Sequence, residues 1–311
     1  MNAYVVLSKL LRGLLTLLLA VTFVFVILRV TGDPASALIA DDAPASVVEA
    51  YRAMWGLDRS LPEQYVRYIL GILHGEFGFS FRDGRPALDI VVERIPTTLL
   101  LGIAALALAI LVGVPAGIVA ALNRGSAIDR LTMSFTVLGY SMPNFFLGIL
   151  LIILFSLHLQ WLPSSGSSSW AHLIMPAMTL ATGIAGVLAR FTRASMLDVL
   201  SQPYIRTARA KGIPLWGRIL WHAIPNAAIP VVTVIGLRIG AVIGGAVVTE
   251  PVFGWPGIGM LLVGSVAQRD LAVVQVIVLL IALTMVTVNL SVDLLYRLID
   301  PRVRSAAAAG K

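Results

Sequence analysis

The chain has 311 residues, of which 58% are hydrophobic and only 13% charged, with a mean hydropathy of +0.92. A soluble domain has about 25% charged residues, so this composition excludes an ordinary soluble protein and indicates an integral membrane protein. There is no cysteine, which excludes disulfides and thiol chemistry, and the four histidines are too scattered to predict a metal site. The net charge of +7 is attributed to the excess of lysine and arginine that membrane proteins carry in their cytoplasmic segments, and not to nucleic-acid binding.

Six stretches are long and apolar enough to cross a bilayer as helices, which takes about 20 residues each. In chain order, they cover residues 10–30, 97–122, 132–157, 173–192, 229–250 and 274–297. Pro115, Pro143 and Pro176 lie within three of them, which membrane helices tolerate when neighbouring groups bond the freed backbone. The first stretch could instead be a signal peptide, but it is longer than the usual apolar region of one and ends in Arg29. We therefore predict a retained anchor helix at 1–30 in an all-α fold.

The distribution of lysine and arginine predicts the orientation. With the N-terminus inside, the inner segments hold fourteen of the 23 basic residues and the outer segments hold seven, while Arg29 and Arg238 belong to spans. The outer stretch 31–95 also holds ten of the sixteen acidic residues. Both termini, including a tail at 301–311, are therefore expected in the cytoplasm.

Residues 31–96 are predicted to form a helical extracytoplasmic insertion. Ser60 and Glu63 have the spacing of a capping box, in which the serine caps a helix and the glutamate bonds back to it. Tyr65, Ile69 and Ile72 then follow at helical spacing. The insertion could be a folded loop that shields helix ends or a docking surface for an extracytoplasmic partner.

A basic segment at 201–225 interrupts the apolar chain between the fourth and fifth spans. Pro203 is suited to the first turn of a short helix, and Gly212 to its left-handed end. Pro214 then begins a second short helix, which Pro225 limits. Taken by themselves, the charge and amphipathicity leave lipid contact and protein docking equally open.

The order of residues in this segment resembles the cytoplasmic signature of ABC importer permeases: Glu-Ala-Ala, three residues, Gly, nine residues, Ile-x-Leu-Pro. Here the three elements are Arg206-Thr207-Ala208, Gly212 and His222-Ala223-Ile224-Pro225, so the glutamate, the first alanine and the first aliphatic residue are replaced. The form "RTARAKG" is similar to that of the dipeptide, oligopeptide and nickel branch. Further segments agree with that branch, among them "GEFGFS", "MPNFFLG", "GGAVVTEPVFGWPGIG" and "RDLAVVQ".

This resemblance implies a type I ABC importer permease fold, with a permease core at 97–300 and coupling helices at 201–225. The residues it assigns to coupling with an ATPase are Tyr204, Arg206, Thr207, Ala208, Arg209, Lys211, Gly212, His222 and Pro225. The implied partners are a second homologous permease, two cytoplasmic ATPase subunits and an extracytoplasmic solute-binding protein, in a bacterial inner membrane. The implied substrates are di- or oligopeptides; nickel, glutathione or oligosaccharides are the alternatives within the family.

The chain itself is predicted not to be an enzyme. None of its three lysines lies in a phosphate-binding loop of the form G-x-x-x-x-G-K-[ST], and no catalytic triad or carboxylate pair stands out. We therefore expect no cofactor or metal in this chain and place ATP and magnesium in the partner subunits. A self-contained secondary transporter is one rival prediction, but it would leave the segment at 201–225 unexplained. A scaffold or receptor-like membrane protein is the other, but it would have no need for Arg238 within a span.

The last two spans contain polar and small residues. Gly236, Gly240 and Gly244 recur at a spacing that lets helices approach closely, for static packing or for a moving seam. Arg238 is costly within a membrane, so it should face protein or water. It is predicted to line the translocation pathway or to form a buried polar seam with Asn289 and Asp293, which share one face of the sixth span.

At the outer end of the fifth span, the segment "TEPVFGWPGIG" combines an acidic residue with prolines, glycines and aromatic rings. An interfacial aromatic belt with a turn is one interpretation. The family resemblance instead implies that Glu250, Phe253 and Trp255 belong to the outer mouth, near the solute-binding protein.

Overall fold

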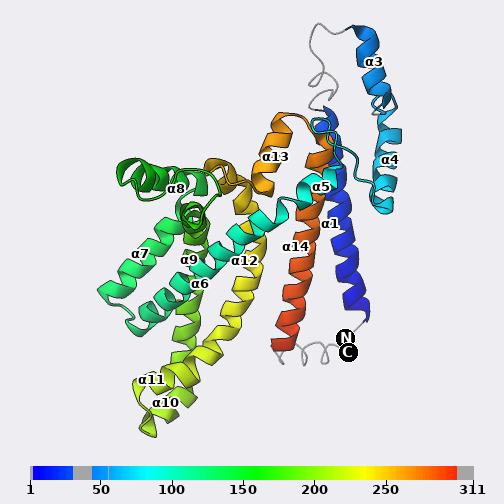
Figure 1. Cartoon of the computed structure of the whole chain (residues 1–311). Helices are drawn as coiled ribbons and strands as arrows, with labels where there is room; N and C mark the ends of the chain where they lie inside the picture. Colours follow the sequence, from blue (N-terminus) through cyan, green and yellow to red (C-terminus); the bar gives the residue numbers. More distant parts are fainter. Residues whose placement is uncertain (1–2, 31–43, 55, 300–311) are drawn as a thin grey trace. The chain divides into compact units, whose positions relative to one another are not determined.

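The computed structural model describes residues 3–30, 44–54 and 56–299 (Figure 1). These residues are helical apart from loops and one isolated bridge between Phe79 and Pro86. The chain forms two compact units, of which the first joins residues 1–98 with 256–286 and the second joins 99–255 with 287–311. The predicted tail at 301–311 lies outside the described residues.

Five of the six predicted spans are single long helices, which confirms the all-α membrane fold. They are α1 (Ala3–Val30), α6 (Ile95–Leu122), α9 (Trp170–Leu200), α12 (Ile224–Val252) and α14 (Leu271–Ile299). Each is long and apolar enough to cross a membrane. Pro115 and Pro176 lie inside α6 and α9 without ending them, as expected for membrane helices.

The predicted third span is not one straight helix, so the prediction for residues 132–157 is wrong in shape. Helix α7 (Ala127–Ser141) ends before Met142. Helix α8 (Asn144–Leu151) continues into the π-helix η1 (Ile152–His158), and this second helix is bent by 105° relative to α7. Met142 is extended, with φ −80° and ψ 127°, because the proline ring of Pro143 disfavours a helical residue before it. The segment is therefore a broken span or a re-entrant pair.

The first unit contains the helices of the predicted insertion, α3 (Ala45–Met54), α4 (Leu61–His74) and α5 (Ala87–Val92), as well as α13 (Ile258–Ala267). The sequence did not predict α13, since its ten residues are too few for a span. Residues 31–43 of the insertion lie outside the described residues.

Ser60 is the N-cap of α4, as predicted, but the capping box is not formed. Its side chain makes no capping hydrogen bond. The carboxylate of Glu63 instead lies 2.5 Å from the guanidinium of Arg59 and 3.7 Å from that of Arg67. Two neighbouring arginines attract the carboxylate more strongly than one backbone amide does. Gly75 then ends the helix in the left-handed conformation, with φ 79°.

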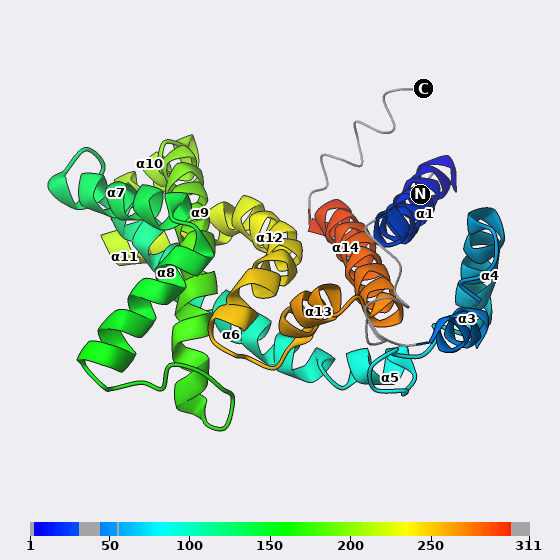
Figure 2. The same cartoon turned by 90° about the horizontal axis from the view of Figure 1, so that it is seen from above.

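Helix α14 organises the first unit. Its buried residues Ala272, Val273, Val276 and Ile277 pack against Ala87, Ile90 and Val91 of α5. Helix α1 lies beside α14 in both views (Figures 1 and 2), where a Cβ on Gly13 would lie 2.8 Å from the side chain of Val286. The glycine thus allows the two long helices to touch.

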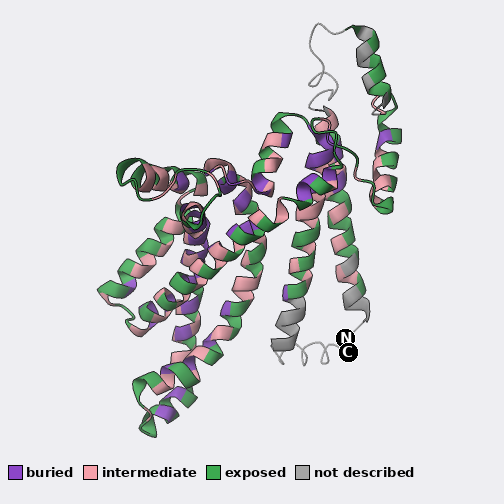
Figure 3. Ribbon diagram, viewed as in Figure 1, coloured by how far each residue is buried: buried purple, intermediate pink, exposed green. Residues whose placement is uncertain are grey.

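Helix α9 is the core of the second unit, and it contacts α7, α8 and α12. Figure 3 shows buried positions spread along its length. Helix α6 approaches it closely at Gly113, where a Cβ would lie 2.6 Å from the carbonyl oxygen of Ala185. The α7 backbone approaches it at Gly186, where a Cβ would lie 2.7 Å from the carbonyl oxygen of Thr136. Small residues therefore set the helix spacing on two sides of α9.

An ion pair also joins α7 to α9. Arg193 donates from Nε and Nη2 to the two carboxylate oxygens of Asp129, at 2.6 and 2.7 Å. The backbone N–H of Gly125 donates to the same carboxylate at 2.9 Å, and the Ser126 hydroxyl caps α7 by accepting from the Asp129 N–H. Asp129 is buried, so the two-point pairing compensates a charge that would otherwise be costly.

Candidate functional site

Helix α10 (Pro203–Ala210) is the first of the two predicted short helices, and its ends agree with the prediction. Pro203 lies in the first turn, and Gly212 adopts φ 76° just past the end. The N–H of Ile213 reaches back to the carbonyl of Ala208 at 3.2 Å and closes the turn. No atom lies within 4 Å of a Cβ placed on Gly212, so its positive φ, and not a lack of space, requires the glycine.

The second predicted short helix does not end at Pro225, and this prediction is corrected. Residues 215–217 (α11) continue through a π-helix, η2 (Arg218–Ala223), directly into α12. Pro225 has no N–H, and its ring would clash with the carbonyl of residue 221 in a regular α-helix. The wider π-turn relieves that clash, so the helix continues. Consequently α11 and η2 form one continuous helical stretch with the fifth span, Leu215–Val252.

The base of α10 is packed against three long helices. Its buried Ile205 belongs to a cluster with Ala121 of α6, Met196 of α9, Ile219 of η2 and Ala227 of α12. The buried side of α10 therefore packs in one cluster with residues near the ends of α6, α9 and α12.

The outward side of this segment is basic and aromatic. Arg206, Arg209 and Lys211 are exposed, and the whole stretch 199–249 contains no acidic residue. The rings of Trp216 and Trp221 are 65% and 78% exposed. The remaining predicted coupling residues divide as follows: Tyr204, Thr207, Gly212 and Pro225 are exposed, His222 is half-buried and Ala208 is buried. Such a surface suits a partner with an apolar groove bordered by acidic groups.

Arg238 lies about midway along α12 and is half-buried. On this helix a Cβ on Gly236 would lie 2.8 Å from Val292, so the Gly236 side faces α14. Arg238 follows two residues later, about 200° further round the helix, and so leaves from the opposite side. Asn289 is exposed, and no hydrogen bond between it and Arg238 occurs within residues 56–299; the Asp293 side chain is outside the described part.

Only some of the glycines of α12 (Gly236, Gly240, Gly244 and Gly245) contact a neighbouring helix. Gly245 lies against Leu180 and Asn144, whereas a Cβ on Gly240 or Gly244 would meet no atom within 4 Å. Close approaches to a neighbouring backbone occur at Gly113 and Gly117 of α6, where an added Cβ would lie 2.6 and 2.4 Å from carbonyl oxygens of α9. These two glycines have the same four-residue spacing, which is the signal that sequence reasoning missed.

The three predicted outer-mouth residues are all buried. Glu250 is 0% exposed, and Phe253 and Trp255 are each 2% exposed. The Trp255 side chain packs with Leu101 and Leu173 in one hydrophobic cluster, and the backbone N–H of Trp255 donates to the backbone carbonyl of Glu250 at 2.9 Å. In this conformation the three side chains are packed inside the protein and are not exposed at its surface.

Comparison with known proteins decides the family. Residues 113–305 match the binding-protein-dependent transport system inner membrane component family, and residues 3–102 match the N-terminal domain of such membrane components. The chain belongs to this family. It is therefore the membrane-embedded permease subunit of an ABC importer, a multi-pass inner-membrane protein, as the resemblance implied.

Curated relatives of this permease include the glutathione transport system permease proteins GsiC of Escherichia coli K12 and Shigella dysenteriae. Each is 45% identical over 300 residues, which is 96% of this chain and 98% of the relative. Among solved structures, the MetNI methionine ABC transporter in an inward-facing conformation has a TM-score of 0.59 at 17% identity, covering 69% of this chain and 98% of that one. An amino acid ABC transporter with histidines has a TM-score of 0.51 at 18% identity, covering 68% and 94%. These structures confirm the permease fold.

Proposed function

We propose that this permease imports short peptides and that the segment at 201–225 couples it to cytoplasmic ATPase subunits. The observation that carries the proposal is the exposed basic and aromatic surface of α10, α11 and η2, whose buried side packs against three long helices. Closure of the ATPases would displace this surface, and the cluster around Ile205 would pass the displacement to α6, α9 and α12. The spans would then open toward the substrate delivered by a solute-binding protein.

The substrate class rests on the relatives. The GsiC proteins are named as glutathione permeases, and glutathione is itself a small peptide. The proposed substrate is accordingly glutathione or a short peptide, while nickel and oligosaccharides are the alternatives within the family. Two ATPase subunits, a second homologous permease and the solute-binding protein complete the proposed transporter, and ATP and magnesium are bound by the ATPases alone.

The proposed topology places both termini and the 201–225 segment in the cytoplasm. Its support is the excess of lysine and arginine in the corresponding segments of the sequence. The domain division proposed from the sequence is unchanged: an anchor at 1–30, an extracytoplasmic insertion at 31–96, a permease core at 97–300 and a tail at 301–311. The 250–255 segment is assigned to the outer mouth, where its buried residues Glu250, Phe253 and Trp255 hold the backbone in shape.

Arg238 is proposed to face the translocation pathway. The alternative, a polar seam with Asn289 and Asp293, has less support. The side of α12 that carries Gly236 faces Val292 of α14, whereas Arg238 projects from the opposite side. A charged side chain in a span needs water or a polar partner, and a water-filled pathway supplies the first. Its guanidinium could then bind the carboxylates that every peptide carries.

Transport by the reconstituted importer tests the substrate assignment. Proteoliposomes containing both permeases and the ATPases would receive ATP inside and a binding protein with labelled glutathione, a dipeptide, nickel or an oligosaccharide outside. We expect ATP-dependent uptake of glutathione or the dipeptide. Uptake of nickel or the oligosaccharide alone would contradict the peptide assignment, and uptake without any ATPase would contradict the coupling assignment.

A further inference from the structure

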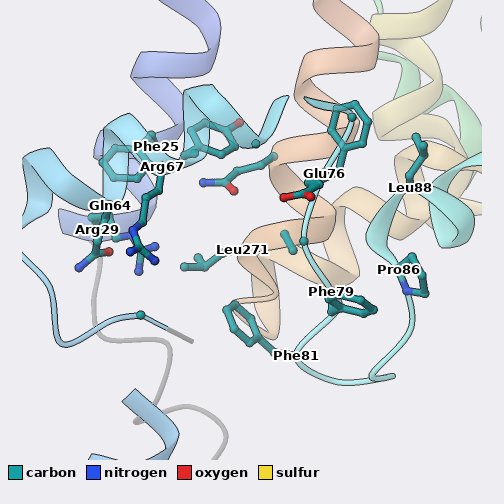
Figure 4. A pocket seen from close by; sticks show the side chains of 18 of the residues that line it. Phe25, Arg29, Gln64, Arg67, Glu76, Phe79, Phe81, Pro86, Leu88 and Leu271 are labelled. Atoms are coloured by element: carbon teal, nitrogen blue, oxygen red, sulfur yellow. The ribbon is translucent and has the colours of Figure 1, made fainter. Parts of the chain in front are cut away.

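A cavity of about 950 Å³ lies beside the C-terminal end of α1, within the first unit. Helix α1, helix α4, the segment 75–81 and the beginning of α14 line it (Figure 4). The apolar span of α1 ends at Arg29, which is one of the lining residues. The cavity therefore lies where a membrane helix reaches the headgroup layer.

Aromatic contacts fix α4 to α1 beneath this cavity. The ring of Phe25 stacks on Tyr68, with centroids 5.7 Å apart, and meets the edge of Tyr65 at 5.3 Å. The hydroxyls of Thr22 and Tyr65 are hydrogen-bonded at 2.6 Å. Burial raises the pKa of the Tyr68 phenol, which thus stays neutral. The wall formed by these residues is preorganised rather than loose.

Gln64 brings an unused acceptor to the cavity. Its side chain is 9% exposed, and its NH₂ group donates to the carbonyl oxygens of Arg59, at 2.8 Å, and Leu57, at 3.4 Å. Because only the NH₂ group can bond to carbonyls, the orientation of the amide is fixed. Its Oε1 atom is buried without a hydrogen-bond partner in the described part of the chain. Such an acceptor calls for an N–H or O–H donor from a ligand.

Charges of both signs face the cavity. Figure 4 shows Arg29 and Arg67 on the same side as Gln64, and Glu76 across from them. The guanidinium of Arg29 lies 5.4 Å from the ring centre of Phe25. The side chain of Arg67 lines the cavity and is 58% exposed, and its Nε atom lies 3.7 Å from a carboxylate oxygen of Glu63. An anionic group suits the arginines, and a cationic N–H donor suits Glu76 and Gln64.

An apolar stripe leads away from the cavity along α1. Thr22, Phe25 and Arg29 share one helix face with Leu18, Leu15 and Leu11, since the spacings alternate between three and four residues. The three leucines are 47%, 54% and 56% exposed, whereas Phe25 is buried under α4. An exposed leucine surface about 10 Å long therefore begins about two turns from the cavity, on the same face of α1.

We propose that this cavity binds the headgroup of a membrane phospholipid that carries a phosphate and a primary ammonium group, as in phosphatidylethanolamine. The phosphate accepts from Arg29 and Arg67, the ammonium donates to Glu76 and Gln64, and the acyl chains cover the leucine stripe. A water-soluble zwitterion such as a peptide would use the same charges but would leave the stripe uncovered. The proposal is independent of the substrate and of the ATPase contact.

Native mass spectrometry of the full-length permease, purified with its accompanying subunits, tests this site. The protein would be delipidated in mild detergent and titrated with phosphatidylethanolamine, phosphatidylcholine or free phosphoethanolamine. The wild type, Gln64→Leu, Arg67→Gln and Leu15→Ser would be compared with the control Arg82→Gln, which removes the same charge outside the cavity lining. Thermal unfolding would confirm that each variant is folded.

We expect phosphatidylethanolamine to bind about tenfold more tightly than phosphatidylcholine, which has no N–H donor, since tenfold corresponds to one charge-assisted hydrogen bond. Gln64→Leu, Arg67→Gln and Leu15→Ser should each weaken that binding, and Arg82→Gln should not. Equal binding of both lipids by all variants would overturn the proposal. Equally tight binding of free phosphoethanolamine, or displacement of the lipid by glutathione, would assign the cavity to a soluble ligand and overturn it as well.

Discussion

The hydroxyl of Ser80 donates a hydrogen bond to the carboxylate of Asp270, a residue 190 positions later in the chain. Both side chains are buried, and Asp270 also accepts from the N–H of Val273 in the first turn of α14, at 3.5 Å. One carboxylate thus caps a long helix and fastens the segment 75–81 to it. The pair joins two of the sequence segments, "GEFGFS" and "RDLAVVQ", that indicated the family.

Replacement of Asp270 by alanine should destabilise the first unit by about 1–3 kcal/mol, because it removes a helix cap and leaves the Ser80 hydroxyl buried without its acceptor. Asp270→Asn, which keeps an acceptor oxygen, should cost less. Thermal unfolding of the purified permease measures both. The control is Asp83→Ala, since Asp83 is exposed and no hydrogen bond from its side chain occurs in the described residues. Equal losses for Asp270→Ala and Asp83→Ala would refute the pairing.

The ion pair between Asp129 and Arg193 predicts a second stability effect. Asp129→Asn should cost about 3 kcal/mol, since it leaves a partly buried arginine without its counter-charge. Arg193→Lys should also be destabilising, because an ammonium cannot bond both carboxylate oxygens as the guanidinium does. A double-mutant cycle with Asp129→Ala and Arg193→Ala would measure the coupling energy. A coupling energy near zero would show that the pair contributes nothing to the α7–α9 contact.

The close approach of α6 to α9 predicts opposite outcomes for two glycines. At Gly113 an added methyl group would lie 2.6 Å from a backbone oxygen of α9, whereas at Gly240 it would meet nothing within 4 Å. Gly113→Ala should therefore force the helices apart and lower the melting temperature, while Gly240→Ala should leave it unchanged or raise it slightly, since alanine favours a helix. A larger effect at Gly240 would mean that this face of α12 packs against a partner.

Gly212 tests the coupling segment by its backbone conformation. Gly212→Ala should be destabilised locally by about 1 kcal/mol, because a left-handed φ is unfavourable for alanine, and Gly212→Asn should be tolerated better. Transport-coupled ATP hydrolysis should fall in the alanine variant and recover in the asparagine variant. Gly125→Ala is the matched control, since Gly125 has φ 78° with free space around it but lies in the 123–126 turn. Equal losses of transport-coupled ATP hydrolysis in Gly212→Ala and Gly125→Ala would mean that backbone strain at any turn has this effect, and would contradict a specific role of Gly212 in coupling.

Arg238 distinguishes the pathway from the polar seam. If it faces the pathway, Arg238→Leu should reduce peptide uptake strongly while ATP hydrolysis and the melting temperature change little, and Arg238→Lys should retain part of the uptake. If it forms the seam, Arg238→Asp should be rescued by Asp293→Arg. Unchanged uptake in Arg238→Leu would remove the pathway assignment.

Much of the fold could be predicted because a membrane helix needs a long apolar run, a property of sequence alone. The local ends of α10 followed from the backbone preferences of Pro203 and Gly212 in the same way. The break at Met142 could not be predicted, since Pro115 and Pro176 are tolerated inside helices and nothing local separates them from Pro143. Likewise, the continuation through Pro225 depends on a π-turn whose packing involves distant helices.

The polar contacts were the least predictable part. Ser60 and Glu63 have capping spacing, yet the nearby arginines draw Glu63 away. Asp129 and Arg193 are 64 residues apart, and Ser80 and Asp270 are 190 apart, so no short motif connects them. The order of residues at 206–225 was enough to indicate a coupling segment from the sequence. The burial of Glu250, Phe253 and Trp255 depends on three-dimensional packing and could not be predicted.

Purification of the permease from its native host in mild detergent tests the central assignment most directly. The co-purifying subunits would be identified and ATP hydrolysis measured, for the wild type and for Gly212→Pro, in which proline cannot adopt the φ of 76°. We predict that ATPase subunits co-purify with the wild type and are lost or uncoupled in the variant. A chain that purifies alone and still transports peptides in liposomes would contradict the assignment and favour a self-contained secondary transporter.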